Sequence, residues 1–93
     1  MQVNGISLHV EDQGHGAPVI LLHGWPDSSH VWRHQIPWLE SNGFRAIAPD
    51  MRGFGRSDRP QDVAAYRLTN AVADVVGVLD GLNIDAAHVV GHD

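Results

Sequence analysis

The sequence predicts an α/β fold whose sheet is mostly parallel. Apolar runs of strand length alternate with segments of helical periodicity, and turns containing glycine or proline separate them. One run, "PVILLHG", is apolar without alternation, which suits a strand covered by helices on both faces. Strands that alternate with helices imply right-handed crossovers and parallel pairing. We therefore expect the element order β-β-β-α-β-α-β.

The chain begins with a predicted antiparallel pair of strands. Asn4-Gly5 is a strong signal for a tight turn, and Ile6, Leu8 and Val10 then alternate with polar residues. This pattern predicts a half-buried strand that pairs with Gln2-Val3. The segment "DQGHGA" is predicted to be a turn that leads into the apolar run "PVILLHG".

The first helix is predicted to begin at Asp27-Ser28-Ser29, which are all residue types that cap helix N-termini. Its apolar stripe comprises Val31, Trp32, Ile36 and Leu39, and Gly43 can close the helix. Pro37 predicts a kink or a break, because it lacks an N–H group and its ring crowds the preceding turn. We interpret Trp32 and Trp38 as helix packing residues.

The strand "FRAIAPD" and the loop "DMRGFGRSDRP" precede a second helix. Thr69 is its predicted N-cap, and Gly81 or Asn83 is its predicted end. The predicted apolar stripe comprises Val72, Val75, Val76, Leu79 and Leu82, with Asp74 and Asp80 elsewhere on the helical wheel. Gly77 weakens this helix, because glycine has a low helix propensity. The segment "AAHVVG" is the last predicted strand.

Composition limits the classes of partner. The formal net charge is -5, every basic residue is an arginine, and no basic cluster is present, so nucleic acid is not an expected partner. The acidic surplus also disfavours anionic membranes, and no signal peptide or membrane span is visible. The chain has no cysteine, which fits a reducing compartment. We therefore expect a cytoplasmic protein.

Residues 1–93 are interpreted as one continuous part of a single α/β domain, without a repeat or a linker. A parallel strand as apolar as "HVV" needs neighbouring strands and helices on both faces, and an uncovered edge would promote aggregation. We therefore expect further chain, or a second chain, to complete the fold.

Candidate functional residues follow the predicted parallel strands. Ligands of open α/β sheets bind beyond the carboxyl ends of the strands. These ends carry the segments 23–27, 50–57 and 91–93. The second segment is predicted to be a fastened loop, which Asp50, Arg52 and Ser57 hold and in which Gly53 and Gly55 permit the turns.

The segments "LLHGWPDSSHVW", "APDMRGFGRSDRP" and "VVGHD" resemble, in order and spacing, the first part of α/β-hydrolase fold enzymes. His23-Gly24-Trp25-Pro26 resembles the His-Gly-X-Pro turn that shapes the oxyanion hole. Gly91-His92-Asp93 resembles the start of the nucleophile elbow, Gly-X-nucleophile-X-Gly. Most of the superfamily uses serine, so Asp93 resembles the aspartate-nucleophile branch of epoxide hydrolases, haloalkane dehalogenases and fluoroacetate dehalogenases. Residues 1–93 would then be the N-terminal part of one core domain, inactive alone, with the rest of the core and a cap domain in further chain.

This resemblance implies covalent catalysis without a cofactor or a metal. A carboxylate can displace an alkoxide or halide from a saturated carbon and leave an alkyl ester, which water activated by a histidine then cleaves. By resemblance, the backbone N–H of Trp25 and that of the residue after Asp93 stabilise the oxyanion of the second step. The implied residues are the nucleophile Asp93, the donor Trp25, the substrate contacts Trp25 and Pro26, and the supporting loop residues His23, Gly24, Gly91 and His92.

Trp25 favours epoxide hydrolases within this branch. Many haloalkane dehalogenases carry a halide-binding asparagine at the X of His-Gly-X-Pro, whereas an aromatic residue there resembles epoxide hydrolases. Dehalogenation stays an alternative, because fluoroacetate dehalogenases also carry an aromatic residue at this position. The expected substrate is a small-molecule epoxide, or alternatively an organohalide. We also predict a cis Trp25-Pro26 bond, because aromatic-proline bonds favour that geometry.

The same residues have other interpretations. Asp93 could be only a helix cap in a non-catalytic binding module, whereas serine esterase activity is disfavoured because no serine occupies the elbow position. His23 is interpreted as a packing residue, because the catalytic histidine of the family comes late in the chain. His30 and His34 have the spacing of a metal pair but lack the glutamate of His-Glu-X-X-His, so no metal site is expected.

Overall fold

The computed structural model describes residues 1–92. Its elements are the strands β1 (Gln2–Val3), β2 (Ile6–Ser7), β3 (Val10–Gly14), β4 (Ala17–Leu22), β5 (Phe44–Pro49) and β6 (His88–Gly91), the α-helices α1 (Gln35–Ser41) and α2 (Leu68–Gly81), and the 3-10 helices η1 (Ser29–Trp32) and η2 (Val63–Tyr66). β1 and β2 pair with each other, and the other strands form a sheet in the order β3-β5-β4-β6. β4 pairs parallel with β5 and β6, whereas β3 pairs antiparallel with β5. The predicted mostly parallel α/β sheet is confirmed.

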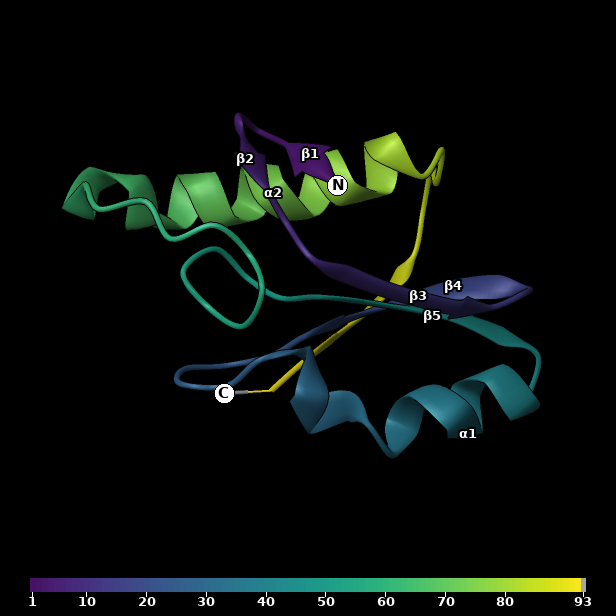
Figure 1. Ribbon diagram of the computed structural model, residues 1–93. Coiled ribbons are helices and arrows are strands. Elements are labelled where there is room, and N and C mark those ends of the chain that lie inside the picture. Colours follow the sequence, from purple (N-terminus) through teal and green to yellow (C-terminus); the bar gives the residue numbers. More distant parts are fainter. Residues whose placement is uncertain (93) are drawn as a thin grey trace.

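The sheet lies between two layers (Figure 1). η1 and α1 cover one face, while α2 and the β1–β2 hairpin cover the other. Along β4, Val19 and Leu21 pack in the core beside α1, and Ile20 packs in the core beside α2. Burial on both faces explains why this strand is apolar without alternation. Truncation of one such side chain to alanine typically costs about 2–5 kcal/mol.

The N-terminal segment differs from its predicted form. The hairpin is as expected, with Val3 opposite Ile6, but β2 ends at Ser7. β3 is a separate strand that runs through residues predicted to form a turn, so the structure has one strand more than expected. Polar residues are tolerated in β3 because it is an edge strand of the described sheet. There Asp12 accepts hydrogen bonds of 2.9 and 2.7 Å from Arg45 of β5.

The predicted break near Pro37 is confirmed. Residues 33–34 separate η1 from α1, and Pro37 is the third residue of α1. A proline in the first turn lacks only an N–H group that would have no partner within the helix, whereas its ring would clash with the carbonyl of Arg33 in a continuous helix. The side chain of Ser28 caps η1 by accepting from the His30 N–H at 3.3 Å. Trp32 is buried as expected, but the prediction for Trp38 was wrong, because it is 61% exposed on the outer face of α1.

The apolar stripe of α2 was partly mispredicted. Val75, Leu79 and Leu82 pack against the core as expected, and so does Val78, which is fully buried. Val72 and Val76 are about half exposed instead, because α2 carries apolar residues on more than one face and the sheet contacts only one. Thr69 is not the cap, since the chain leaves η2 through Arg67 and is already helical at Leu68. No helix within residues 1–92 is long and apolar enough to cross a bilayer.

Candidate active site

The ends of β4 and β6 bring two of the predicted site segments together. The two strands are parallel with Leu22 opposite Gly91, and the N–H of His92 donates to the carbonyl of Leu22 at 3.0 Å. The turn 23–26 and His92 therefore leave the same edge of the sheet as neighbours (Figure 1). Asp93, the predicted nucleophile, lies outside the described residues. Ligands of α/β sheets bind at this edge, so the turn and the end of β6 border the candidate site.

His23 is a buried side chain that joins two loops. The backbone N–H of Met51 donates to its Nε2 atom at 2.9 Å. Because a backbone N–H can only donate, Nε2 accepts, and the ring proton resides on Nδ1. Nδ1 lies 2.8 Å from the carbonyl oxygen of Gly24, to which it donates. The rings of His23 and Phe54 also pack edge to face, with centroids 5.5 Å apart and planes at 79°.

The turn after β4 contains the predicted cis bond. Trp25-Pro26 is cis in the structure, which confirms that expectation. The carbonyl of Gly24 accepts a second hydrogen bond, from the N–H of Asp27 at 3.0 Å. The indole of Trp25 is 78% exposed and is available for contact with a ligand or with further protein. A groove of about 500 Å³ runs beside Pro26 and Phe54.

Asp50 fastens the loop after β5 from inside the protein. Its side chain accepts from the backbone N–H groups of Ser29 at 2.7 Å and of Arg56 at 3.0 Å. Burial raises the pKa of this carboxyl, but the hydrogen bonds from Arg56 and Ser29 outweigh that effect and hold the pKa below its usual range. Gly55 has φ of +55°, and a Cβ atom there would collide with the Asp50 carboxylate. Asp50 thus joins the loop to η1.

Arg52 and Asp74 form a buried ion pair that the sequence did not predict. The guanidinium donates to the carboxylate through Nε at 2.6 Å and Nη2 at 2.8 Å, and Asn4 donates to the same carboxylate at 3.1 Å. Asp74 raises the pKa of Arg52 further above its usual value. The sequence analysis assigned Asp74 away from the apolar stripe, and nothing in the sequence identified its partner in a loop 22 residues earlier.

Trp32 and His92 connect η1 to the end of β6. Their rings pack edge to face, with centroids 6.2 Å apart and planes at 83°. The indole Nε1 of Trp32 is buried and has no acceptor among residues 1–92. Gly91 is exposed at the end of β6. The residue before the predicted nucleophile is therefore held by its backbone against β4 and by its ring against η1.

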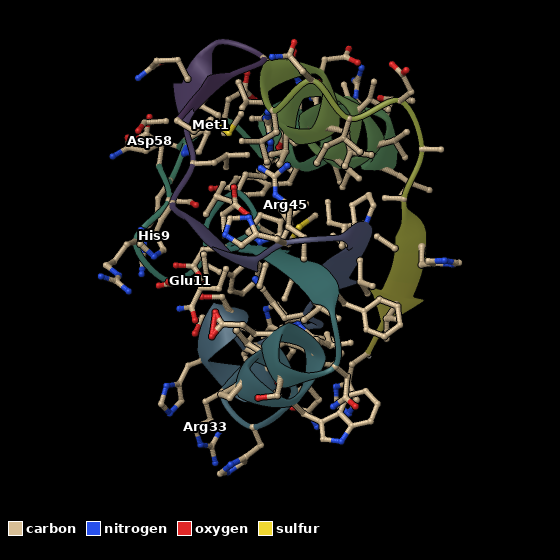
Figure 2. All side chains as sticks on the ribbon, turned by 90° about the vertical axis from the view of Figure 1, so that its right-hand side faces the viewer. Met1, His9, Glu11, Arg33, Arg45 and Asp58 are labelled. Carbon is tan, nitrogen blue, oxygen red and sulfur yellow. The ribbon has the colours of Figure 1, made fainter. Side chains whose placement is uncertain are left out.

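A second cavity shares Ser28, His30, Arg33 and Gly55 with the groove beside Pro26. It encloses about 410 Å³ and is lined by residues that include Glu11, Arg33 and Arg56. Figure 2 shows Glu11 and Arg33 on the same side of the molecule. Arg56 donates to Glu11 at 3.2 Å, so the charged groups of this cavity partly neutralise one another.

Comparisons with known proteins show the family. The family model described as alpha/beta hydrolase fold matches residues 17–93. An epoxide hydrolase of Caballeronia sordidicola is 52% identical over 90 residues, which cover 97% of this chain and 27% of the relative. Epoxide hydrolase 2 of Siraitia grosvenorii is 48% identical over 93 residues, which cover 100% of this chain and 29% of the relative. The crystal structure of an epoxide hydrolase from Vigna radiata matches with a TM-score of 0.98 at 42% identity, covering 100% of this chain and 30% of that one.

The chain thus spans less than a third of the length of these relatives. The part that it spans contains the strands, the turn after β4 and the end of β6 that border the site. The family match covers most of the chain and reaches its final residue. The chain therefore belongs to the alpha/beta hydrolase fold family.

Proposed function

We propose that the protein containing this chain hydrolyses epoxides to vicinal diols through an ester on Asp93. The observation that carries the proposal is the hydrogen-bonded register of β4 and β6. In this register the turn "HGWP" follows β4 next to the end of β6, and the sequence continues from β6 to Asp93. The similarity to epoxide hydrolases of Caballeronia sordidicola, Siraitia grosvenorii and Vigna radiata supports the substrate class.

In the first step, a carboxylate oxygen of Asp93 attacks a ring carbon of the epoxide. A bond between that oxygen and that carbon forms, and the bond between the carbon and the ring oxygen breaks. The ring oxygen takes a proton from an acidic group elsewhere in the protein and becomes a hydroxyl. The product is a hydroxyalkyl ester of Asp93, and a carboxylate suits this displacement at saturated carbon better than a serine hydroxyl does.

In the second step, water attacks the Cγ atom of Asp93 while a general base removes its proton. The negative charge then lies on an oxygen of Asp93 itself. The N–H of Trp25 donates to this oxygen, and loss of one such donor typically costs about 3 kcal/mol of transition-state stabilisation. The bond between Cγ and the substrate-bound oxygen breaks, and that oxygen takes a proton as the diol leaves. The carboxylate of Asp93 is restored.

The remaining expectations belong to the same proposal. The general base and the proton donor for the ring oxygen would come from further chain, with the rest of the core and a cap domain. Trp25 and Pro26 would contact the substrate from the turn after β4. No specific observation favours an organohalide over an epoxide, so dehalogenation is an outcome of the test below. The cytoplasmic location stays a prediction.

The test is a rapid quench of the full-length gene product with excess styrene oxide, followed by measurement of its denatured intact mass. The proposal predicts a gain of one substrate mass that decays as diol appears. Asp93→Asn should gain no mass, because a neutral amide is a poor nucleophile. Asp85→Asn, which changes an exposed aspartate just before β6, should react like the wild type.

Three results would contradict the proposal. An adduct on Asp93→Asn that persists without deamidation would place the nucleophile elsewhere. Adduct formation and halide release with a bromoalkane, but no reaction with styrene oxide, would favour the dehalogenase. No reaction of the wild type with either compound would favour a non-catalytic binding module.

A further inference from the structure

We propose that His23 is a positioning residue that aims the backbone N–H of Trp25 into the active site. It acts through the peptide group that joins Gly24 to Trp25. This inference rests on the proposed function, because the Trp25 N–H matters to the rate only if an oxyanion forms beside it.

The orientation of this N–H follows from the carbonyl on the same peptide. The Gly24 carbonyl accepts from Nδ1 of His23 at 2.8 Å and from the N–H of Asp27 at 3.0 Å. The Gly24–Trp25 peptide is trans, since the only cis bond within residues 1–92 is Trp25-Pro26. In a planar trans peptide, the C=O and N–H point in opposite directions. The Trp25 N–H therefore points away from His23 and Asp27.

The Trp25 N–H is also available to a ligand. Within residues 1–92 it donates to no backbone or side-chain acceptor. A backbone donor without a protein partner is normally satisfied by water or by a ligand. An oxyanion that forms at this edge of the sheet is such an acceptor.

His23 can fix the peptide because its own ring is fixed. It is 8% exposed, and Nε2 is held by the Met51 N–H at 2.9 Å. Met51 lies between Asp50 and Arg52, whose buried side chains tie this segment to η1 and to α2. The His23 ring thus holds the Gly24–Trp25 peptide in a fixed orientation relative to the anchored loop 50–57. The hydrogen bond from the Asp27 N–H cannot fix this orientation alone, because Asp27 belongs to the same turn and can move together with the peptide.

Two amide side chains separate the two hydrogen bonds of His23. In His23→Asn, the amide N–H lies near the position of Nδ1 and retains the bond to the Gly24 carbonyl, but the bond from Met51 is lost. In His23→Gln, the amide oxygen lies near the position of Nε2 and retains the bond from Met51, but the Gly24 carbonyl loses its donor. Each variant removes one hydrogen bond, so the two are matched controls for stability.

The experiment is a single turnover of styrene oxide by the full-length wild type and both variants, with ester formation and ester hydrolysis timed separately by intact mass. His23→Gln should slow hydrolysis roughly ten- to hundredfold, less than the roughly hundred- to thousandfold effect of losing an oxyanion donor. Its ester should accumulate, while ester formation stays within about threefold of wild type, since no charge develops on the Asp93 carbonyl in that step. His23→Asn should hydrolyse the ester within about threefold of the wild-type rate. Thermal unfolding should show similar losses of stability in both.

Equal rates of hydrolysis in His23→Gln and wild type would overturn the inference. So would an equal slowing of both steps in both variants, which a purely structural role predicts. The proposed function fails separately, and the inference with it, if the wild type forms no ester at all. A second measurement needs no variant: the nitrogen NMR signals of the His23 ring should show a protonated Nδ1 and an unprotonated Nε2. The opposite tautomer would overturn the inference even if both variants failed to fold.

Discussion

Arg52 and Asp74 are joined across the protein interior by two hydrogen bonds, and their side chains are only 7% and 2% exposed. The pair connects the loop after β5 to the middle of α2. The Nη1 atom of the guanidinium also donates to the carbonyl of Ala65 at 2.7 Å. A buried ion pair adds little to the free energy of unfolding compared with two well-packed apolar residues. Removing one partner lowers that free energy strongly, because the other charge is then buried without a partner.

Single and double substitution of this pair should therefore be strongly non-additive. Arg52→Met or Asp74→Leu alone should lower the free energy of unfolding by about 3–5 kcal/mol, because each leaves one buried charge without its partner. The double variant should lose less than the sum, because no uncompensated charge remains. Urea denaturation of the full-length proteins measures this coupling. Strictly additive losses would show that the two side chains do not interact in solution.

For the substitution Gly77→Ala in α2, packing and helix propensity predict opposite effects on stability. Propensity alone predicts that Gly77→Ala stabilises the protein by about 1 kcal/mol. In the structure, a Cβ atom at Gly77 would collide with Cγ1 of Val3 in β1, and a β-branched side chain cannot easily move aside. We expect Gly77→Ala to be destabilising. In the background of Val3→Ala, the same substitution should become neutral or stabilising, and a gain in the wild-type background would refute the close packing of β1 on α2.

Acid pH should weaken the loop after β5 through Asp50. Its pKa is held below the usual value, so the carboxylate contributes stability that is fully present above an unfolded pKa of about 3.9 and is lost as the pH falls through the folded pKa. Asp12 also contributes stability that is lost at acid pH, because its hydrogen bonds from Arg45 lower its pKa. This contribution is smaller, since the site is partly exposed to solvent. Urea midpoints measured from about pH 6 down to about pH 3 should fall in the wild type.

The matched control for this titration is Asp50→Asn. Its amide oxygen can still accept from Ser29, but its NH₂ group would face the N–H of Arg56, so the variant should be less stable at neutral pH. It should also lose less stability on acidification than the wild type does. Identical pH slopes for the two proteins would mean that Asp50 does not carry the acid sensitivity.

The sequence predicted well those features that depend on local pattern. The apolar run of β4, the break before Pro37 and the cis Trp25-Pro26 bond each follow from a few adjacent residues, and each is confirmed. Features that depend on distant contacts were missed. The helical pattern assigned Asp74 away from the apolar stripe. Its burial could not be predicted, because its partner Arg52 is brought to it only by the crossover between β5 and α2.

In the candidate site, too, local motifs predicted some features, whereas contacts between distant segments were missed. The motifs placed His23, Trp25 and His92 at the correct edge of the sheet, since the ends of parallel strands meet there. The sequence alone could not show that the His23 ring bridges Met51 and Gly24, because that contact depends on how two loops approach one another. The role of Asp93 stays a prediction.

The most direct test of the covalent route is a single turnover of styrene oxide by excess full-length enzyme in water labelled with oxygen-18. Hydrolysis at Cγ leaves the oxygen of water on Asp93 and sends an original carboxylate oxygen out with the diol. The account predicts labelled Asp93 in the digested protein and unlabelled diol from the first turnover. Labelled diol with unlabelled Asp93 would mean that water attacks the epoxide directly, and it would contradict the assignment of Asp93 as the nucleophile.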